Sequence, residues 1–530
     1  MTMNLRDSLL DALKSLPGTR EFHIHTLVSL PSKSQELFPY VSPRPRVWEQ
    51  HIIVLASEQT SVAQPRVFVT AVEAYFYVIP STRSGILYIS KVDSTGQGHK
   101  PSPTSTIVKQ FIQFYVDPDT RPNLGGTSSL AEHVWVHVFA RAQGQYLFPN
   151  SAHFHGKKPL SDVKLCGWWK SIVTSVVEQL SKRGARKEGE RIRLWYLLPG
   201  LNELEAFQAL RSTSSTSLNP STGSDPSSIT WTYGHPSTQK FDDVDAILLP
   251  CPTDDKGGVS DGGYNLGRFI PSFEDDPKAR FMDEIAHTTN TEVVKSPVRK
   301  KAKKAADEGV HEVGKKDGSW MGELEKVTPE EYWERMSFRQ ECVAGIVTGF
   351  FAMGYVSFPT RLGVGGMDST LASQPGQVSS NITKRVMNSL MTGIEFSTVD
   401  KAVRGTETLE GAIKGMCEGI PAGVYVDPPR LREEHRRETP ERTEQDDHLV
   451  FPPSTPPRKT GSVATEIFPG SFPEPTASLE TYGSWIYGSV CVDNPLADKP
   501  SREREGSDRA SDRRITVLTV RKKRKKEGMS

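Results

Sequence analysis

The adjacent tryptophans Trp168 and Trp169 are the most unusual chemical feature of this 530-residue sequence. Neighbouring positions of a helix point about 100° apart, so one ring could enter the core while the other lines a cleft. Two tryptophans at the edge of a core would produce the same pattern. The spacing therefore leaves a binding role and a packing role open.

The segment FEDDPKARFMDEI, residues 273–285, places two aspartates before a proline and a lysine. Asp276 stands where the N-cap of a helix would be, and Pro277 suits the first helical position. Phe281 and Ile285 would then share one face of that helix. Taken alone, the segment predicts an ordinary helix start with Lys278 exposed in its first turn.

Other chemical signatures are weaker. The histidine pairs at 133/137 and 153/155 have no third partner with metal-ligand spacing, so no metal site is expected. The glycine-rich run at 361–368 lacks the strand before it and the helix after it that a phosphate loop requires. Cys166 has no evident base beside it, which favours a buried cysteine over a nucleophile. The Walker, GxSxG and HExxH motifs do not occur in the sequence.

Strands and helices alternate through the first half of the chain. Residues 66–93 predict a β-hairpin with its turn at 80–85, and residues 132–140 and 191–199 predict further strands. The spacing of apolar residues predicts helices at 104–116 and 164–183. This order predicts an α/β fold, a mixed β-sheet covered by helices.

The second half of the chain is less regular. The long apolar run at 329–357 predicts a buried helix, and residues 402–420 predict a final helix. Polar, low-complexity composition predicts disordered insertions at about 212–228 and 286–318 and a disordered tail at 426–530. An apolar island in that tail, residues 479–492, could fold on a partner or be an inert sticky patch.

Composition narrows the class of protein. Hydrophobic residues make up 36% of the chain and the net charge is +1, so the whole molecule does not have the charge of a nucleic-acid binder. Basic runs at 299–304 and 521–526 predict solvated tails or import signals. A tail that serves only to keep the protein soluble would have the same composition. The five cysteines form no CxxC pair, and no run of 18 apolar residues occurs. We expect a soluble intracellular protein without a disulfide framework or a membrane anchor.

Four segments in the same order resemble one known family. They are QYLFPNS at 145–151, GKKPLSDVKLCGWW at 156–169, FEDDPKARFMDE at 273–284 and SFRQECVAGIVTGFFAMGYVS at 337–357. Together they resemble the fungal, chaperone-dependent histone acetyltransferases of the regulator-of-Ty-transposition type, over roughly residues 8–425. The resemblance implies a central mixed β-sheet surrounded by helices, distantly similar to the acetyltransferase core of the CREB-binding protein coactivators.

The resemblance also implies a site. Asp93, Tyr146, Trp169 and Asp276 would line the place where the substrate lysine meets the thioester, and Lys278 would be a buried, autoacetylated lysine. Acetyl-CoA would be held by Val92, Asp93, Ser94, Pro101, Ser102, Pro103, Thr104, Ser105, Phe139, Gln143, Lys158, Pro159, Leu160 and Trp168.

This sequence departs from the family pattern at the coenzyme site. Lys158 replaces a common histidine, Gln143 replaces a small residue, and residues 101–105 lack the arginines that some members present to the phosphates. Lys100, Lys109 or Lys157 would have to supply that charge.

The implied activity is acetyl transfer in the nucleus to histone H3, at lysine 56 and at N-terminal tail lysines, in replication-coupled nucleosome assembly and the DNA damage response. The implied partners are the H3–H4 complex and histone chaperones, and binding to a membrane or to specific DNA sequences is not expected.

The substrate lysine has to be deprotonated before it can attack. Near neutral pH only about one free lysine side chain in a thousand is neutral, so forming the neutral amine costs roughly 4 kcal/mol. Aromatic walls from Tyr146 and Trp169 would lower the pKa of the substrate lysine, and Asp93 or Asp276 would accept its proton. The alternative is a non-catalytic chromatin or chaperone scaffold that retains the fold.

Overall fold

The computed structural model describes thirteen stretches of the chain. They are residues 4–41, 43–61, 63–122, 131–182, 190–211, 229–238, 247–251, 270–287, 324, 327–339, 346–357, 376–417 and 481–495. The predicted insertion at 212–228 lies outside these stretches, as do the glycine-rich run, both basic runs and most of the insertion predicted at 286–318.

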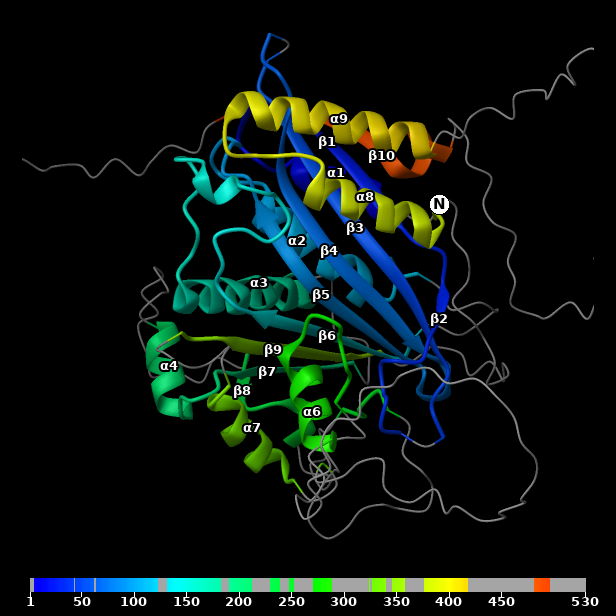
Figure 1. The fold of residues 1–530 in the computed structure, drawn as a ribbon, viewed down its shortest axis with the longest axis vertical. Coiled ribbons are helices and arrows are strands. Elements are labelled where there is room, and N and C mark those ends of the chain that lie inside the picture. The colour runs from blue at the N-terminus through cyan, green and yellow to red at the C-terminus, as the bar shows by residue number, and fades with distance from the viewer. Residues whose placement is uncertain are drawn as a thin grey trace, which may run out of the picture. The chain divides into compact units, whose positions relative to one another are not determined.

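One mixed sheet of ten described strands organises the fold (Figure 1). Its strands are β1 (Gly18–Val28), β2 (Ser32–Ser34), β3 (Val47–Gln59), β4 (Val67–Ile79), β5 (Ser84–Ser94), β6 (His133–Ala140), β7 (Arg191–Leu197), β8 (Trp231–Tyr233), β9 (Gly349–Val356) and β10 (Tyr487–Asn494). The spatial order is β10-β1-β3-β4-β5-β6-β9-β7-β8, with β2 beside β3. The β5–β6 and β7–β8 pairs are parallel, and the other pairs are antiparallel. The predicted mixed α/β fold is confirmed.

Helices cover both faces of this sheet. Side chains alternate along a strand, and in β4 Val72, Ala74 and Phe76 pack with α1 (Leu5–Leu13), α2 (Thr104–Val116) and α3 (Asp162–Lys182). Phe68 and Ala71 point the other way, toward α8 (Ser380–Thr392) and α9 (Val399–Cys417).

The remaining helices extend these layers. Helix α4 (Glu203–Arg211) joins the cluster of α3, while α6 (Pro277–His287) and α7 (Pro329–Ser337) form a cluster of their own with β7 and β9. No helix within the described stretches is long and apolar enough to cross a membrane.

The predicted elements of the first half are confirmed. The hairpin is β4 and β5, joined by the 3-10 turn Pro80–Thr82, and the strands predicted at 132 and 191 are β6 and β7. The helices predicted at 104–116 and 164–183 are α2 and α3. In the second half, the helix predicted at 402–420 is α9, and residues 418–420 lie outside the described stretches.

The prediction of one buried helix over 329–357 is wrong. Helix α7 ends at Ser337, and the apolar residues Gly349–Val356 form β9 instead. Every residue of β9 is buried, because β6 and β7 flank it on both edges and helices cover both faces. A strand buried on both faces has no polar positions that would reveal its period of two.

The prediction of disorder across the whole of 426–530 is also wrong. Residues 481–495 belong to the folded part, where β10 pairs with β1 over eight residues from Gly18/Asn494 to His25/Tyr487. The apolar island therefore folds on the chain's own sheet edge. Tyr482 and Ile486 enter the cluster under α8 and α9, and Val492 enters the cluster of α1.

Candidate active site

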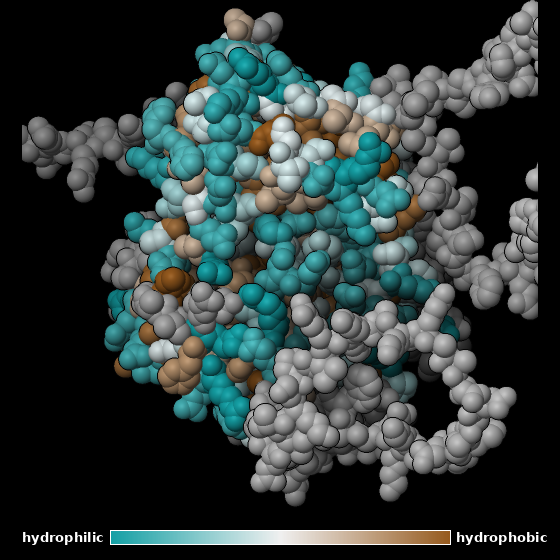
Figure 2. Space-filling view, viewed as in Figure 1, coloured by the Kyte–Doolittle hydropathy of each residue, from teal (hydrophilic) through white to brown (hydrophobic). Residues whose placement is uncertain are grey.

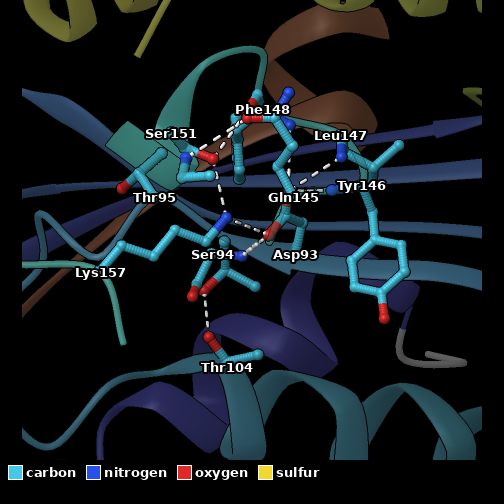
Figure 3. Close-up of polar contacts among 12 residues, drawn as sticks. Asp93, Ser94, Thr95, Thr104, Gln145, Tyr146, Leu147, Phe148, Ser151 and Lys157 are labelled. Carbon is cyan, nitrogen blue, oxygen red and sulfur yellow. Dashed lines mark hydrogen bonds and ion pairs between the residues drawn. The ribbon is translucent and has the colours of Figure 1, made fainter. Parts of the chain in front are cut away.

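Asp93 ties the end of β5 to the loop at 146–148 (Figure 3). Its Oδ2 accepts hydrogen bonds from the amides of residues 146, 147 and 148 at 2.8, 2.9 and 3.1 Å. Its Oδ1 accepts from the Ser94 amide at 2.8 Å and from Lys157 Nζ at 2.7 Å. The carboxylate is 5% exposed and engaged by five donors, which is the arrangement of an anchor.

Lys157 is the cation of this anchor. Its Nζ also donates to Ser151 Oγ at 2.7 Å, and burial lowers its pKa while the Asp93 carboxylate opposes that shift. Gly96 adopts φ +77° against it, and a Cβ there would lie 2.5 Å from the Lys157 Cα. Of the three lysines considered for the phosphates, Lys157 is therefore committed to an internal ion pair.

The first turn of α2 faces the tryptophan pair. Trp168 Nε1 donates to Ser105 Oγ at 3.0 Å. The N-cap residue Pro103 has no capping side chain, and Ser102 Oγ accepts a hydrogen bond from the Thr104 amide at 3.4 Å. Thr104 Oγ1 lies 2.8 Å from Thr70 Oγ1, which fixes the turn to β4. The two indole rings lie edge to face with centroids 4.8 Å apart. Trp169 is buried and Trp168 half-buried, so one ring enters the core and the other lies at its margin.

Tyr146 stands beside these groups. Its hydroxyl donates to the Arg141 carbonyl, and burial raises its pKa to about 12. The hydroxyl is therefore neutral near pH 7. Cys166 lies beneath it in the core with a pKa raised to about 12 by burial, in agreement with the predicted buried cysteine.

Arg20 and Glu58 support the loop before α2, and sequence patterns did not reveal them. The Arg20 guanidinium donates to the carbonyls of His99 and Pro101 at 3.4 and 3.1 Å. It pairs with Glu58 at 3.4 Å, and both side chains are only 2% exposed. The partners lie 38 to 81 positions apart in the chain, so no local motif links them.

Asp276 and Lys278 form a second buried group. Asp276 Oδ1 caps α6 by accepting the Lys278 amide at 2.8 Å, as the helix-start pattern predicts. Its Oδ2 accepts from the Lys278 ammonium, which is 3% exposed. The expectation of an exposed lysine is wrong, because the side chain turns back under the helix start. The ammonium also lies 4.6 Å from the centre of the Phe350 ring.

Neutral aromatic groups surround this ion pair. Burial, with the nearby Lys278 charge, lowers the pKa of His137 to about 3 and that of His235 well below its usual value. The Tyr332 hydroxyl donates to the Lys278 carbonyl at 3.1 Å. Of the described groups around the Asp276–Lys278 pair, His137, His235 and Tyr332 are therefore uncharged near pH 7.

The implied site residues fall into these two groups and an exposed rim. Residues 92–94, 101–105, 146, 168 and 169 come together around the Asp93 anchor, whereas Asp276 and Lys278 lie against Phe350, whose ring packs on Phe139 at 4.9 Å. Gln143, Lys158, Pro159 and Leu160 stand exposed beside the anchor. No hydrogen bond joins Asp93 to Asp276, and in the described part of the chain no three His, Cys, Asp or Glu side chains gather as metal ligands would.

Comparison with known proteins identifies the class to which this fold and site belong. The family described as the histone acetyltransferase KAT11-type domain matches residues 9–122 and 127–411, which is most of the chain. The chain therefore belongs to this family of acetyltransferase domains.

Within that class, the chain is similar to proteins named histone acetyltransferase rtt109. It is 26% identical to the one from Aspergillus flavus over 357 residues, which are 64% of this chain and 54% of the relative. It is 22% identical to the one from Schizosaccharomyces pombe over 310 residues, 57% of this chain and 60% of the relative. The chain thus spans a little over half the length of these relatives.

The crystal structure of Rtt109 from Aspergillus fumigatus has the same fold. The TM-score is 0.54 at 22% sequence identity, and the match covers 78% of this chain and 96% of that one. Likeness at this identity concerns the fold, and the resemblance to the Rtt type predicted from the four segments is confirmed.

Proposed function

We propose that this chain is a histone lysine acetyltransferase that takes its acetyl group from acetyl-CoA. The observation that carries the proposal is the first turn of α2, which lies against Trp168 of α3 and whose N-cap residue, Pro103, has no capping side chain. Free amides at a helix N-terminus attract phosphate groups, and an indole offers a flat wall to the rest of the coenzyme. Membership of the family supports the same conclusion.

The coenzyme would lie across the strand end. Residues 92–94 and 101–105 would form one wall, and the exposed residues 158–160 would form the other. Since Lys157 is held by Asp93, Lys100 and Lys109 are the remaining cations for the phosphates, with Lys158 on the rim. Acetyl-CoA would supply the activated acetyl group as a thioester, and no metal is needed for this transfer.

The acceptor lysine has to lose a proton before it attacks. Asp93 already accepts five hydrogen bonds, so we assign it a positioning role that holds residues 146–148 in place. Asp276 is the better proton acceptor once its own partner is neutral. Acetylation of Lys278 forms an N–C bond and breaks the C–S bond of acetyl-CoA. Of the two protons that the ammonium loses, one leaves on the CoA thiol and the other is released to solvent. The Asp276 Oδ2 would then lose its ammonium partner and be free to accept a proton directly or through water.

The proposed substrate and cellular location are inferred from the relatives named histone acetyltransferase. We propose that the H3–H4 complex is the substrate, presented by a histone chaperone in the nucleus, with lysine 56 of H3 and tail lysines as acceptors in nucleosome assembly and DNA repair. The catalytic domain would comprise residues 8–425 together with β10. The terminal basic run would serve import and partner binding.

Labelled acetyl-CoA tests the proposal directly. The full chain, incubated with H3–H4 and a histone chaperone, should transfer label to H3, and Trp169→Ala should lower turnover at least tenfold, about 1.4 kcal/mol in the barrier. Lys33→Ala, an exposed position on β2, is a matched control that should retain full activity. Binding of H3–H4 without any transfer of label would overturn acetyl transfer and favour a scaffold.

A further inference from the structure

A pocket opens on the face of the sheet that carries α8 and α6, away from the Asp93 anchor. Its floor is formed by β3, β4 and β5, and its walls by the segment at 34–37 and the segment at 272–275. The Ser272 amide donates to the Leu37 carbonyl at 2.8 Å, which joins the two walls. The cavity volume is about 80 Å³, enough for the end of one polar side chain. Figure 2 shows mainly hydrophilic residues across the middle of this face, between α8 and α6.

Three tyrosines from adjacent strands line the floor. Tyr75 stands opposite Tyr88 in the β4–β5 register, and Tyr77 stands opposite Glu49 in the β3–β4 register, so all four share one face. Tyr77 is 6% and Tyr88 3% exposed, and the Tyr88 ring stacks on Phe273 at 4.0 Å. No side-chain hydrogen bond of Tyr77 or Tyr88 is found among the described residues, and both side chains line the pocket. Both hydroxyls are therefore available to a hydrogen-bonding group that enters the pocket.

The charges around the pocket are negative. Glu36, Glu49, Glu274 and Asp275 contribute four carboxylates, and no lysine or arginine is among the described lining residues. Burial raises the pKa of Glu49, and the neighbouring Glu36 and Glu274 raise it further.

Two basic side chains beside the pocket are already engaged by carboxylates. Lys91 pairs with Asp275 and with Glu73, both at 2.7 Å, and His51 lies 3.2 Å from the same Glu73. Lys91 thus compensates the charge of Asp275, whereas the described lining holds no lysine or arginine for the carboxyl groups of Glu36, Glu49 and Glu274.

We propose that this pocket binds a protonated amine or guanidinium group. Such a cation brings N–H donors for the Tyr77 and Tyr88 hydroxyls and positive charge for the carboxylates. A trimethylated ammonium would leave the hydroxyls without donors, and an anion would be repelled. The group can come from a lysine or arginine side chain of a protein substrate or from a free polyamine.

The pocket lies where a side chain of a protein substrate could reach it. Asp275 lines the pocket, and the next residue is the Asp276 carboxylate that holds Lys278. A basic residue near the acceptor lysine would then be held beside the proposed catalytic group. This identification of the source rests on the proposed function, whereas the binding of the cation does not.

Isothermal titration calorimetry with the full chain tests the inference. The probes are spermidine and a blocked peptide containing two lysines, together with its Nε-acetylated and Nε-trimethylated forms. We expect the free-amine probes to bind, the acetylated peptide not to bind, and the trimethylated peptide to bind at least tenfold more weakly. Glu49→Gln should weaken binding at least tenfold and Tyr88→Phe at least threefold, with melting temperatures no lower than that of the wild type.

Tyr115→Phe is the matched control, because Tyr115 is equally buried but lies in α2. Its affinity for the probes should equal that of the wild type. Binding of the peptide in preference to spermidine assigns the pocket to a substrate side chain, and the reverse assigns it to a polyamine. The inference is overturned if no probe binds the wild type, or if Glu49→Gln and Tyr88→Phe bind as well as the wild type. Loss of acetyl transfer with intact, Glu49-dependent binding would overturn the proposed function alone.

Discussion

Asp93 acts on the candidate site through the groups that it holds. Asp93→Asn removes the charge that neutralises Lys157 and leaves that ammonium buried and unpaired. Breaking one partner of a buried pair typically destabilises by about 3–5 kcal/mol, so we expect a lower melting temperature together with reduced turnover. The double variant Asp93→Asn/Lys157→Met should recover part of the stability. Normal stability in the single variant would contradict the anchoring role.

Among the described residues, the carboxylate partner of Lys278 is Asp276, which is also the proposed proton acceptor. We predict that Lys278 is acetylated in active enzyme, and that Lys278→Arg, which keeps the charge and cannot be acetylated, lowers turnover at least tenfold. Peptide mass spectrometry of the purified protein checks the first statement and steady-state kinetics the second. An active enzyme whose Lys278 is entirely unmodified would refute it.

Glu49 should weaken the fold near neutral pH. Its pKa is raised in the folded protein, so the folded state holds a proton that the unfolded chain has already released. The contribution of Glu49 to stability is therefore present below its unfolded pKa of about 4.5 and is lost as the pH rises through the raised value. Glu49→Gln should raise the melting temperature at pH 7 but not at pH 4. An equal effect at both pH values would contradict this assignment.

At the scale of elements, β10 is held by side chains that respond to acid. His25 Nε2 lies 2.9 Å from the Tyr482 hydroxyl and His23 Nδ1 lies 2.8 Å from the Tyr487 hydroxyl. Burial and the Arg66 charge lower the pKa of His23 to about 4 and that of His25 to about 3. The unfolded chain therefore binds protons first as the pH falls below about 6.5, and stability is lost from there toward pH 4.

Hydrogen exchange should show this loss locally. We expect the amides of 487–494 to lose protection between about pH 6 and pH 4 before those of β4 and β5 do. Glu410 pairs with Arg66, and Glu21 lies 3.5 Å from His23. Both carboxylates therefore reduce the loss of stability that protonation of the histidines causes.

Arg6→Ala should release strand β10 even at pH 7, because the Arg6 guanidinium donates to the carbonyls of Gly483 and Tyr487 at 2.7 and 2.8 Å. If the amides of β10 in the wild type stay as protected at pH 4 as those of β4 and β5, the predicted acid-dependent release is wrong. If Arg6→Ala leaves the protection of β10 unchanged at pH 7, the role of Arg6 is wrong.

Local patterns predicted the elements that have two distinct faces. Helices α2 and α3 and the hairpin β4–β5 carry periodic apolar residues and a turn, and all were found where predicted. Strand β9 was mistaken for a helix because both of its faces are buried. Strand β10 was mistaken for disorder because its partner β1 lies more than 460 positions away, and no local signal reports such a pairing.

The candidate site was predictable only in part for the same reason. The cap at Asp276 is a local motif and could be predicted from spacing. The pairing of Asp93 with Lys157 and the support of Arg20 for the loop before α2 join residues 64 to 81 positions apart. The family resemblance named Asp93 and Lys278 as expected site residues, whereas the ion pairs that hold their side chains required the structure.

At the scale of the whole molecule, two truncations should separate folding from partner binding. Deleting residues 496–530 removes the basic run but leaves β10, so stability and turnover should stay unchanged while chaperone binding becomes weaker in a salt-sensitive way. Deleting from residue 481 also removes β10 with its buried Val492, and the turn before it with the buried Tyr482 and Ile486. The melting temperature should then fall by roughly 5 °C or more. Equal melting temperatures of the two truncated proteins would show that β10 does not stabilise the fold.

The pairing of β1 with β10 also sets the order of events during synthesis. Thr19 Oγ1 donates to Asp493 Oδ1 at 2.6 Å, across 474 positions of the chain. At about 5–20 residues per second, a ribosome needs on the order of half a minute or longer to travel between them. Throughout that interval, the backbone groups along the outer edge of β1 can be recruited by another nascent chain. A polypeptide released early never acquires the strand that covers this edge, so incomplete copies remain recognisable to chaperones and proteases.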